Sequence, residues 1–152
     1  MHLDWQVKHF RDLSLNEFHD IIAIRIEVFV IEQNCTYQDL DGKDKKCYHL
    51  ICRDDKGDIV STARIAQPGL IYDEIALGRI VITEKLRGKG FGHELMKECI
   101  EFCKVKFGNT SIRMSAQSHL KKYYEHHNFI PTGKEYLEDG IPHSEMLYIP
   151  KN

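Results

Sequence analysis

The sequence lacks the long apolar run, the basic block and the low-complexity linker that would each point to a particular class of protein. No stretch approaches the ~20 consecutive apolar residues that a membrane helix needs, and residues 1–6 contain no core of a signal peptide. Lysine and arginine total 21 against 23 acidic residues, giving a net charge of −2, which disfavours nucleic acids and anionic membranes as partners. We therefore expect a cytoplasmic protein that binds neither.

Cysteine is present but is not arranged for metal binding or for a disulfide framework. The five cysteines are odd in number and include no C-x-x-C pair, which disfavours a zinc site. Cys99 and Cys103 lie one helical turn apart in an apolar pattern, where a free thiol packs as a small hydrophobic group. The sequence predicts reduced cysteines and no bound metal.

The composition is that of one folded domain. Apolar residues make up 42% of the 152 residues and charged residues 29%, which are ordinary values for a globular protein. A chain of this size buries roughly 70% of the surface that its unfolded form exposes. Because no linker or repeat interrupts the chain, we expect a single domain over residues 1–152.

Hydrophobic periodicity and turn residues predict an α+β domain. Ser14 and Glu17 have the spacing of a capping box. Helices are predicted over 14–30, 91–107 and 119–127, strands over 47–53, 59–65, 74–83 and 111–116, and a polar loop over 32–46. Turns at Pro131 and at Asp139-Gly140 separate two last strand-like pieces. Early antiparallel strands followed by a strand–helix–strand unit predict a mixed sheet.

A glycine-rich loop joins a predicted strand to the longest predicted helix, and it reads Arg87-Gly88-Lys89-Gly90-Phe91-Gly92. Glycines let the backbone approach a ligand closely, and amides at a helix N-terminus attract anions, so a pyrophosphate is the natural ligand. A strand-to-helix turn without a ligand explains the glycines equally well. The P-loop pattern is absent, and so is the third glycine that the dinucleotide fingerprint G-x-G-x-x-G needs.

Further segments carry a family resemblance. Arg87-x-x-Gly90-x-Gly92 resembles the acetyl-CoA pyrophosphate motif of the Gcn5-related N-acetyltransferases, the GNAT superfamily. The apolar strand 78–84 resembles the strand that leads into this motif, and residues 123–129 (YYEHHNF) resemble the family's aromatic-Tyr-Glu-x-x-Gly-Phe segment. Asn128 replaces the family's glycine, and asparagine tolerates the positive φ that we expect there.

The rest of the chain resembles the ElaA-like subgroup of that family. Its marks are the segments 25–33 (RIEVFVIEQ), 116–120 (AQSHL) and 136–143 (YLEDGIPH), and the matches run in order from about residue 25 to residue 146. The resemblance implies a mixed, mostly antiparallel central sheet flanked by helices. That sheet is expected to splay between the strand before the pyrophosphate loop and the strand after the following helix.

The resemblance also implies acetyl-CoA as the acyl donor. Backbone groups of Ile80, Val81 and Ile82 would pair with the pantetheine arm, and the Val81 amide would polarise the thioester carbonyl. The pyrophosphate would bind the loop residues Arg87, Gly88, Lys89, Gly90, Phe91 and Gly92. Gln117 stands where many relatives carry an asparagine that contacts the cofactor.

Tyr124 occupies the family's general-acid position, where a phenol that contacts the donor can protonate or stabilise the departing thiolate. The alternative is an aromatic side chain that only packs against helix 91–107. Tyr123 is the adjacent competitor, but the family pattern places the tyrosine immediately before Glu125. By this resemblance the chain is an N-acetyltransferase in which a primary amine attacks the thioester directly.

An attacking amine must lose its proton, and the sequence offers several candidates for the general base. Glu74 begins the strand that enters the loop, near the base of some relatives, with a solvated strand-end glutamate as the alternative. Glu32 and Gln33 follow the first helix and would hold a cationic acceptor. His143 would reach the acceptor from a late hairpin, whereas His49 has the alternative of a hydrogen-bonded strand histidine.

Arg64 and Arg79 are cationic residues inside apolar strands, and a buried arginine usually needs a carboxylate partner. Glu32, Asp41 and Asp44 are available, which favours structural ion pairs. An acceptor that carries a carboxylate, bound by Arg79, is the alternative.

Two functions without catalysis fit the same fold. One is an acyl-CoA-binding sensor, and the other is an interaction domain with a vestigial cofactor loop. The acceptor amine, the acyl-chain preference and the oligomeric state stay open, although these folds often form homodimers.

Overall fold

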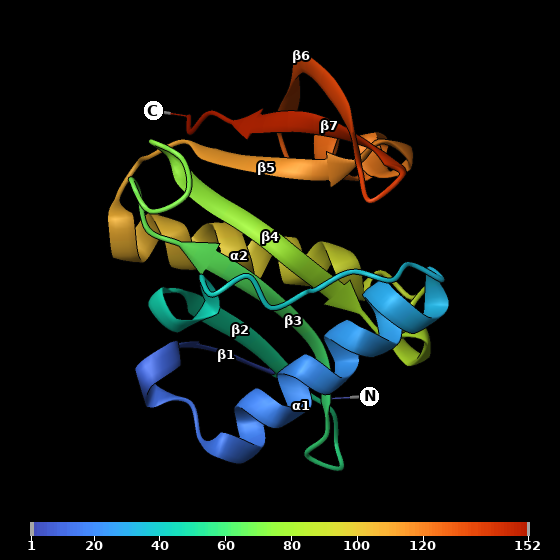
Figure 1. The fold of residues 1–152 in the computed structure, drawn as a ribbon. Coiled ribbons are helices and arrows are strands. Elements are labelled where there is room, and N and C mark those ends of the chain that lie inside the picture. The colour runs from blue at the N-terminus through green and yellow to red at the C-terminus, as the bar shows by residue number, and fades with distance from the viewer. Residues whose placement is uncertain (1, 152) are drawn as a thin grey trace.

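The computed structural model describes residues 2–151 as one seven-stranded sheet with helices on both faces (Figure 1). The strands are β1 (Asp4–His9), β2 (Tyr48–Arg53), β3 (Ile59–Ala66), β4 (Ile75–Ile82), β5 (Ile112–Gln117), β6 (Phe129–Glu138) and β7 (Ile141–Tyr148). The helices are α1 (Leu15–Arg25), α2 (Phe91–Phe107) and α3 (Lys121–Glu125), with short 3-10 turns η1 (Phe10–Asp12), η3 (Asp44–Lys46), η4 (Glu84–Leu86) and η5 (Ser118–Leu120).

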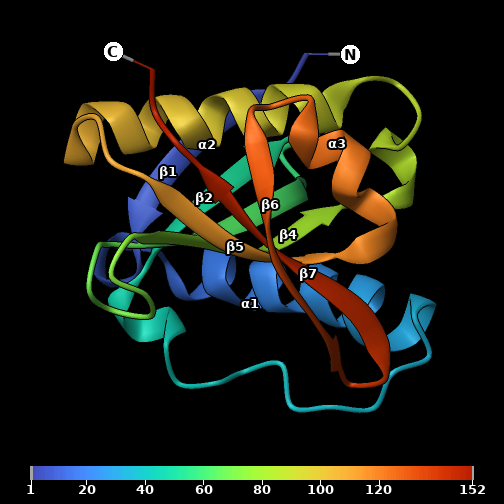
Figure 2. The same ribbon diagram turned by 90° about the horizontal axis from the view of Figure 1, so that it is seen from above.

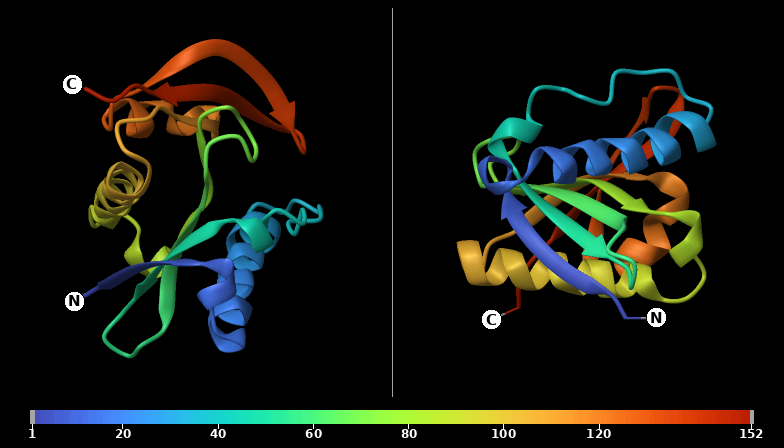
Figure 3. Two further views of the ribbon diagram at one scale, coloured as in Figure 1. Left: turned by 90° about the vertical axis from the view of Figure 1, so that its left-hand side faces the viewer. Right: turned by 90° about the horizontal axis from the view of Figure 1, so that it is seen from below.

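The strand order is β1-β2-β3-β4-β5-β7-β6, with β4 and β5 parallel and the other neighbours antiparallel. α1 and α2 lie on opposite faces of this sheet, as Figure 2 and the left panel of Figure 3 show from two directions. Across residues 2–151, no helix has both the length and the apolar composition to span a bilayer.

The first helix begins where its capping residues predict. The Ser14 hydroxyl accepts the Glu17 amide, and the Glu17 carboxylate accepts the Ser14 amide, so the capping box is confirmed. The helix then continues as the π-helical segment η2 (Ile26–Glu32), two residues beyond the predicted end. π-helical turns recur at functional sites, and this one carries Val28, Phe29 and Glu32 to the cavity described below.

Strand β1 was not predicted from the sequence. Its apolar residues Trp5 and Val7 alternate with Asp4, Gln6 and Lys8, which is a short pattern in which polar residues predominate. The strand forms because β2 supplies six paired positions along it, from His9 opposite Tyr48 to Asp4 opposite Arg53. That partner is a tertiary feature, which local propensity does not reveal.

The C-terminal hairpin corrects one prediction and confirms another. Pro131 does not form a turn, because it lies inside β6, the edge strand of the sheet, where the register with β7 shifts. An edge strand tolerates proline because the missing amide can face away from the partner. Asp139 and Gly140, with φ of 50° and 78°, form the predicted turn between β6 and β7.

β4 and β5 pair only at their beginnings, Ile75 with Ile112 and Ala76 with Arg113. Beyond these pairs the strands diverge, and Figure 1 shows the opening between them. β4 also carries a bulge, where its register with β3 shifts and Arg79 adopts a φ of 50°. The splayed, mostly antiparallel sheet expected from the resemblance is therefore confirmed.

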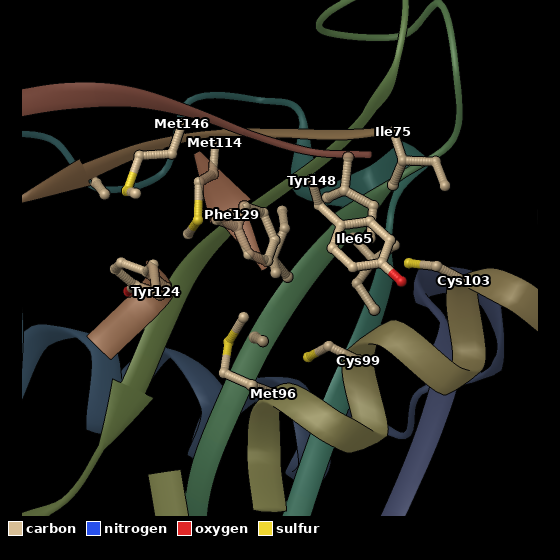
Figure 4. Packing of buried hydrophobic residues seen from close by; sticks show 14 of the residues in the cluster. Ile65, Ile75, Met96, Cys99, Cys103, Met114, Tyr124, Phe129, Met146 and Tyr148 are labelled. Atoms are coloured by element: carbon tan, nitrogen blue, oxygen red, sulfur yellow. The ribbon is translucent and has the colours of Figure 1, made fainter. Parts of the chain in front are cut away.

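The main core lies between α2 and the sheet (Figure 4). α2 contributes Leu95, Met96, Cys99 and Cys103, which recur at helical spacing on one face. Burial raises the pKa of the Cys103 thiol to about 12 and also raises the pKa of Cys99. Both thiols are therefore protonated and pack as hydrophobic groups, as the sequence predicts.

Candidate active site

The opening between β4 and β5 holds a cavity of about 970 Å³. Its walls come from η2 and the loop after it, β4, β5, α3 and the β6–β7 turn, which are far apart in the chain. The predicted site residues that line it are Glu32, Gln33, Arg79, Ile80, Ile82, Arg87, Gln117, Tyr124 and His143. Folding thus brings the predicted donor and acceptor residues to one cavity.

Sequence reasoning missed several polar residues of this cavity. They are Cys35, Tyr37 and Gln38 from the loop after η2, Ser115 from β5, and Glu138 and Asp139 from the end of β6. Cys35 Sγ lies 3.7 Å from the Asp139 carbonyl oxygen, so the loop meets the β6–β7 turn across the cavity. Strand alternation offered a signal for Ser115, since it shares a face with Gln117 two residues later.

Glu74 lies outside this cavity, at the end of β4 opposite the glycine loop. Its two carboxylate oxygens accept hydrogen bonds from Arg113, at 2.9 Å from Nε and 2.7 Å from Nη2. These hydrogen bonds lower the pKa of Glu74 to about 2, so the carboxylate has little affinity for a proton at neutral pH. Position and pKa both argue against Glu74 as the general base.

Val81 is fully buried and does not line the cavity, whereas its neighbours on either side do. Thr83 donates its amide to the Val60 carbonyl of β3, and alternation along the strand turns the Val81 amide toward β3 as well. Ile82 faces the open edge, where its carbonyl accepts a hydrogen bond of 2.9 Å from Arg87 Nε. This geometry argues against the Val81 amide as the oxyanion donor.

The glycine loop leads from η4 into α2 and presents open backbone. Gly88 and Gly90 have φ of 74° and 83°, which glycine adopts without strain. A Cβ added at either position would meet nothing within 4 Å. Gly90 caps α2 without a side-chain hydrogen bond; the His93 amide donates to the Gly90 carbonyl at 3.1 Å, whereas the amides of Phe91 and Gly92 have no acceptor among the described residues. Open space beside free amides fits an anion such as a pyrophosphate.

Other loop residues have packing roles. A Cβ on Gly92 would lie 2.8 Å from Ile82 Cδ1, and the Gly92 carbonyl accepts a hydrogen bond of 2.5 Å from the Tyr123 hydroxyl. Phe91 packs in the apolar cluster beneath the loop, and Lys89 donates to a carbonyl of η4. A larger residue at position 92 would displace the end of the Ile82 side chain and crowd Tyr123, so close packing favours glycine there whether or not a ligand is bound.

Arg87 joins the glycine loop to the end of η2. Its Nη1 lies 2.6 Å from Glu32 Oε1, and its Nη2 donates to Glu32 Oε2 at 3.2 Å. Both residues line the cavity and are partly exposed. The Arg87 guanidinium, which the sequence analysis assigns to the pyrophosphate, is therefore paired with the Glu32 carboxylate. The same analysis assigns Glu32 to the acceptor.

The two adjacent tyrosines differ in what their hydroxyls do. The Tyr123 hydroxyl is held by the Gly92 carbonyl. Among the described residues no hydrogen-bond partner holds the Tyr124 hydroxyl, and that oxygen is not shut off from the cavity. Figure 4 shows Tyr124 at the edge of the core, where its ring packs against Phe129. Burial raises the pKa of Tyr124, so the hydroxyl keeps its proton at neutral pH. The packing interpretation and the acid interpretation are thus compatible.

Three arginines and three aspartates form a closed ring of ion pairs behind the β4 wall. In order, the ring runs Arg25, Asp39, Arg79, Asp41, Arg64, Asp44 and back to Arg25. The Arg25–Asp39 and Arg25–Asp44 contacts measure 2.7 and 2.8 Å, and Arg25 is only 1% exposed. The formal charges cancel, and the ring ties the 33–46 loop to the sheet. A buried ring of this kind is costly to break at any one member.

The ring contains the carboxylate partners of Arg64 and Arg79, the two arginines that lie in strands. Arg64 pairs with Asp41 and Asp44, as predicted, whereas Glu32 pairs with Arg87 instead. Arg79 lines the cavity but is held from behind by the ring. Its Nε lies 2.7 Å from the Asp39 carboxylate in a charge contact without hydrogen-bond geometry, and its Nη2 donates to the Asp39 carbonyl at 3.0 Å.

The two candidate histidines lie in different places. His49 is buried beside the ring, with Nε2 2.9 Å from the Asp44 carbonyl, and burial lowers its pKa. It does not line the cavity, which supports the structural interpretation. His143 lies on β7 opposite Gln117 and lines the cavity with it.

At position 128, the predicted positive φ is confirmed, since Asn128 has a φ of 69°.

Comparison with known proteins places this geometry in a family. The family model described as "Acetyltransferase (GNAT) domain" matches residues 12–149. The chain is 36% identical to protein ElaA of Escherichia coli over 145 residues, which cover 95% of each chain. It is 35% identical to a UPF0039 protein of Synechocystis over 153 residues, covering 100% of this chain and 99% of the relative.

Superposition on solved structures supports the same family. A protein of Pseudomonas aeruginosa described as an acyl-CoA N-acyltransferase superposes with a TM-score of 0.92 at 37% identity, covering 97% of this chain and 99% of the other. Escherichia coli ElaA superposes with a TM-score of 0.90 at 34% identity over 97% and 99% of the two chains. With a family match across nearly the whole chain, the splayed sheet and the glycine loop are those of a GNAT-superfamily protein, and the chain belongs to the ElaA-like subgroup of that superfamily.

Proposed function

We propose that the chain is an acetyl-CoA-dependent N-acetyltransferase whose acceptor is a primary amine. The observation that carries the proposal is the cavity itself, since it joins the open edge of β4, the Tyr124 side chain and Arg87 of the glycine loop. Family membership supports acyl-CoA-dependent acyl transfer in general. The acetyl group and the amine acceptor are the specific part of the proposal.

The donor half of the cavity fits acetyl-CoA by its backbone. Gly88 and Gly90 leave open space, and the uncapped N-terminus of α2 supplies amides for a pyrophosphate. Among residues 2–151, no strand pairs beyond Ala76 with the edge of β4 that faces β5, so the Ile82 backbone can pair there with an extended arm. When bound there, acetyl-CoA supplies an acetyl group activated as a thioester.

Tyr124 is the proposed general acid. A leaving sulfur needs a proton or a hydrogen bond, and the Tyr124 hydroxyl is free to give either. Its raised pKa keeps the proton in place until it is needed. Tyr123 is not proposed for this role, because its hydroxyl already donates to the Gly92 carbonyl.

Calorimetric titration with acetyl-CoA, beside free CoA and NADH, tests the donor. We expect micromolar binding of acetyl-CoA and no binding of NADH. Release of free thiol in the presence of a panel of amines then tests transfer. Tight binding with no thiol release from any amine would leave an acyl-CoA sensor as the function, and no binding at millimolar concentration would leave only an interaction domain.

A further inference from the structure

The wall of the cavity opposite β4 carries a group of polar side chains on one face of the sheet. The register pairs Gln117 of β5 with His143 of β7, and His143 with Tyr136 of β6. Paired residues of antiparallel strands share a face, and period-2 alternation adds Ser115 and Glu138. Ser115, Gln117, Glu138 and His143 all line the cavity.

The tautomer of His143 follows from its partner. His143 Nδ1 lies 2.7 Å from the Ile141 carbonyl oxygen, which can only accept a hydrogen bond, so Nδ1 carries a proton. In the neutral ring Nε2 is then a bare acceptor. The Tyr136 ring lies nearly parallel to the imidazole, with an interplanar angle of 14° and ring centroids 6.3 Å apart.

Glu138 is held facing that acceptor. Its Oε2 lies 3.4 Å from His143 Nε2, and its Oε1 accepts a hydrogen bond of 3.1 Å from Ser115 Oγ. Ser115 in turn accepts a hydrogen bond of 2.6 Å from the Tyr136 hydroxyl. A carboxylate and a neutral imidazole nitrogen at this distance are two acceptors without a donor between them. A proton on His143 satisfies both, and so does an ammonium group that donates to both.

The charges around the pair favour a cation. The two arginines that line the cavity are already paired, Arg79 with the ion-pair ring and Arg87 with Glu32, which leaves His119 and His143 as its other basic side chains. Burial raises the pKa of Tyr37 in the facing loop, so its hydroxyl keeps its proton, and Asp139 adds a second carboxylate beside Glu138. The unmatched charge at this end of the cavity is therefore negative.

On the premise of the proposed function, we propose that Glu138 and His143 bind the acceptor as an alkylammonium ion and that His143 is the general base. The ammonium donates one hydrogen bond to Glu138 and one to His143 Nε2. The N–H bond of the ammonium that points at His143 breaks, and its proton forms a bond to Nε2. The electron pair stays on the amine nitrogen as the lone pair needed for attack. The resulting imidazolium is stabilised by the Glu138 carboxylate and by the Ile141 carbonyl.

Binding is tested without the donor, by ¹⁵N NMR of the imidazole nitrogens with n-butylamine as the probe and n-butanol as its uncharged control. We expect the amine, but not the alcohol, to shift His143 Nε2. Glu138→Gln should abolish the shift. Glu135→Gln on the same strand removes a carboxylate outside the cavity and should leave the shift intact. An unshifted Nε2, or equal shifts in both variants, would overturn the amine site.

The proton-transfer role is tested by the pH profile of kcat/KM for the same amine. His143→Gln should lower kcat/KM at pH 7 by roughly 10²-fold, and the deficit should shrink as pH approaches the amine pKa near ~10, where the amine loses its proton unaided. The control His126→Gln removes an exposed histidine outside the cavity and should not alter the profile. A deficit that is constant across pH would overturn the role of His143 as base.

Calorimetry with acetyl-CoA separates this inference from the proposed function. Unchanged donor affinity in His143→Gln and Glu138→Gln is expected and shows that both variants fold. If the wild type shifts Nε2 with amine but releases no thiol, the amine site stands and the proposed transferase function falls. If thiol is released but neither variant slows it, the transferase stands and this inference falls.

Discussion

The two walls of the cavity offer ligands different chemistry. The β4 wall and the glycine loop present backbone, with open space over Gly88 and Gly90 and an unpaired strand edge. The opposite wall, formed by β5, β6 and β7, presents polar side chains that include Glu138 and His143. Backbone sites need only a local motif, whereas side-chain sites depend on which distant segments meet. The first wall therefore suits a donor common to a family, and we propose that the second wall determines acceptor specificity.

The largest expected effect is on the ion-pair ring behind the β4 wall. Asp44 lies between Arg25 and Arg64, which are 1% and 7% exposed. Asp44→Asn leaves two buried guanidinium groups with one fewer counter-charge, and should lower the free energy of unfolding by about 3–5 kcal/mol. Urea denaturation measures this. Asp20→Asn, which alters an exposed pair with His19, is the control and should change stability little.

The ring also predicts a loss of stability in acid. Burial raises the pKa of Asp41, but hydrogen bonds from Arg64 and the Lys43 amide outweigh it and lower the pKa to about 2. Because the folded-state pKa is lowered, this contribution is complete above the unfolded value of 3.8 and is lost as pH falls through about 2. Urea denaturation from pH 5 to pH 2 should show this loss, and Asp41→Asn should show less of it. Parallel curves for the two proteins would count against it.

Tyr124→Phe should lower kcat by about 10²-fold while the affinity for acetyl-CoA changes by less than about twofold. The hydroxyl is the only group removed, and the ring that packs on Phe129 remains. Thiol release and calorimetry measure the two quantities. Tyr123→Phe sharpens the contrast, because loss of its hydrogen bond to Gly92 should weaken donor binding more than turnover. Equal losses of turnover and affinity in Tyr124→Phe would refute its acid role.

Gly90→Asp should weaken acetyl-CoA binding by at least about 10-fold, because it places a carboxylate in the open space proposed for a pyrophosphate. Gly90→Asn has nearly the same shape and the same strain at a φ of 83°, without the charge. The difference between the two variants in calorimetry therefore isolates the repulsion. If both bind equally well, the loop does not hold an anion.

The smallest expected effect is at the contact between Arg87 of the glycine loop and Glu32 at the end of η2. Glu32→Gln removes the carboxylate that holds Arg87, and should tighten acetyl-CoA binding about two- to fivefold, the size expected for a partly exposed pair. Glu27→Gln changes an exposed residue of the same helical segment that does not line the cavity, and should leave the affinity unchanged. Weaker binding in Glu32→Gln would mean that the pair positions Arg87 for the donor.

Local signals predicted much of the fold because their physical causes are local. Ser14 and Glu17 cap each other, and the apolar face of 91–107 sets a helix that the structure reproduces at both ends. Strand β1 was missed and Pro131 was wrongly placed in a turn, because each segment becomes a strand by pairing with another strand that the local sequence does not reveal. Among the predicted site residues, Tyr124 and His143 line the cavity, whereas Glu74 lies outside it and pairs with Arg113.

The sequence by itself determined the family, most of the helices and strands, and the glycine loop, since each depends on residues that are close together in the chain. Only the tertiary structure decided what the charged residues do. The sequence offered Asp41 and Asp44 of the polar loop as partners for the strand arginines, but not Asp39 or Arg25, which close the ring. Glu138 faces His143 because a hairpin turn brings them together. Electrostatic interactions act through space, so a charged residue's role is fixed only when folding assigns its partner.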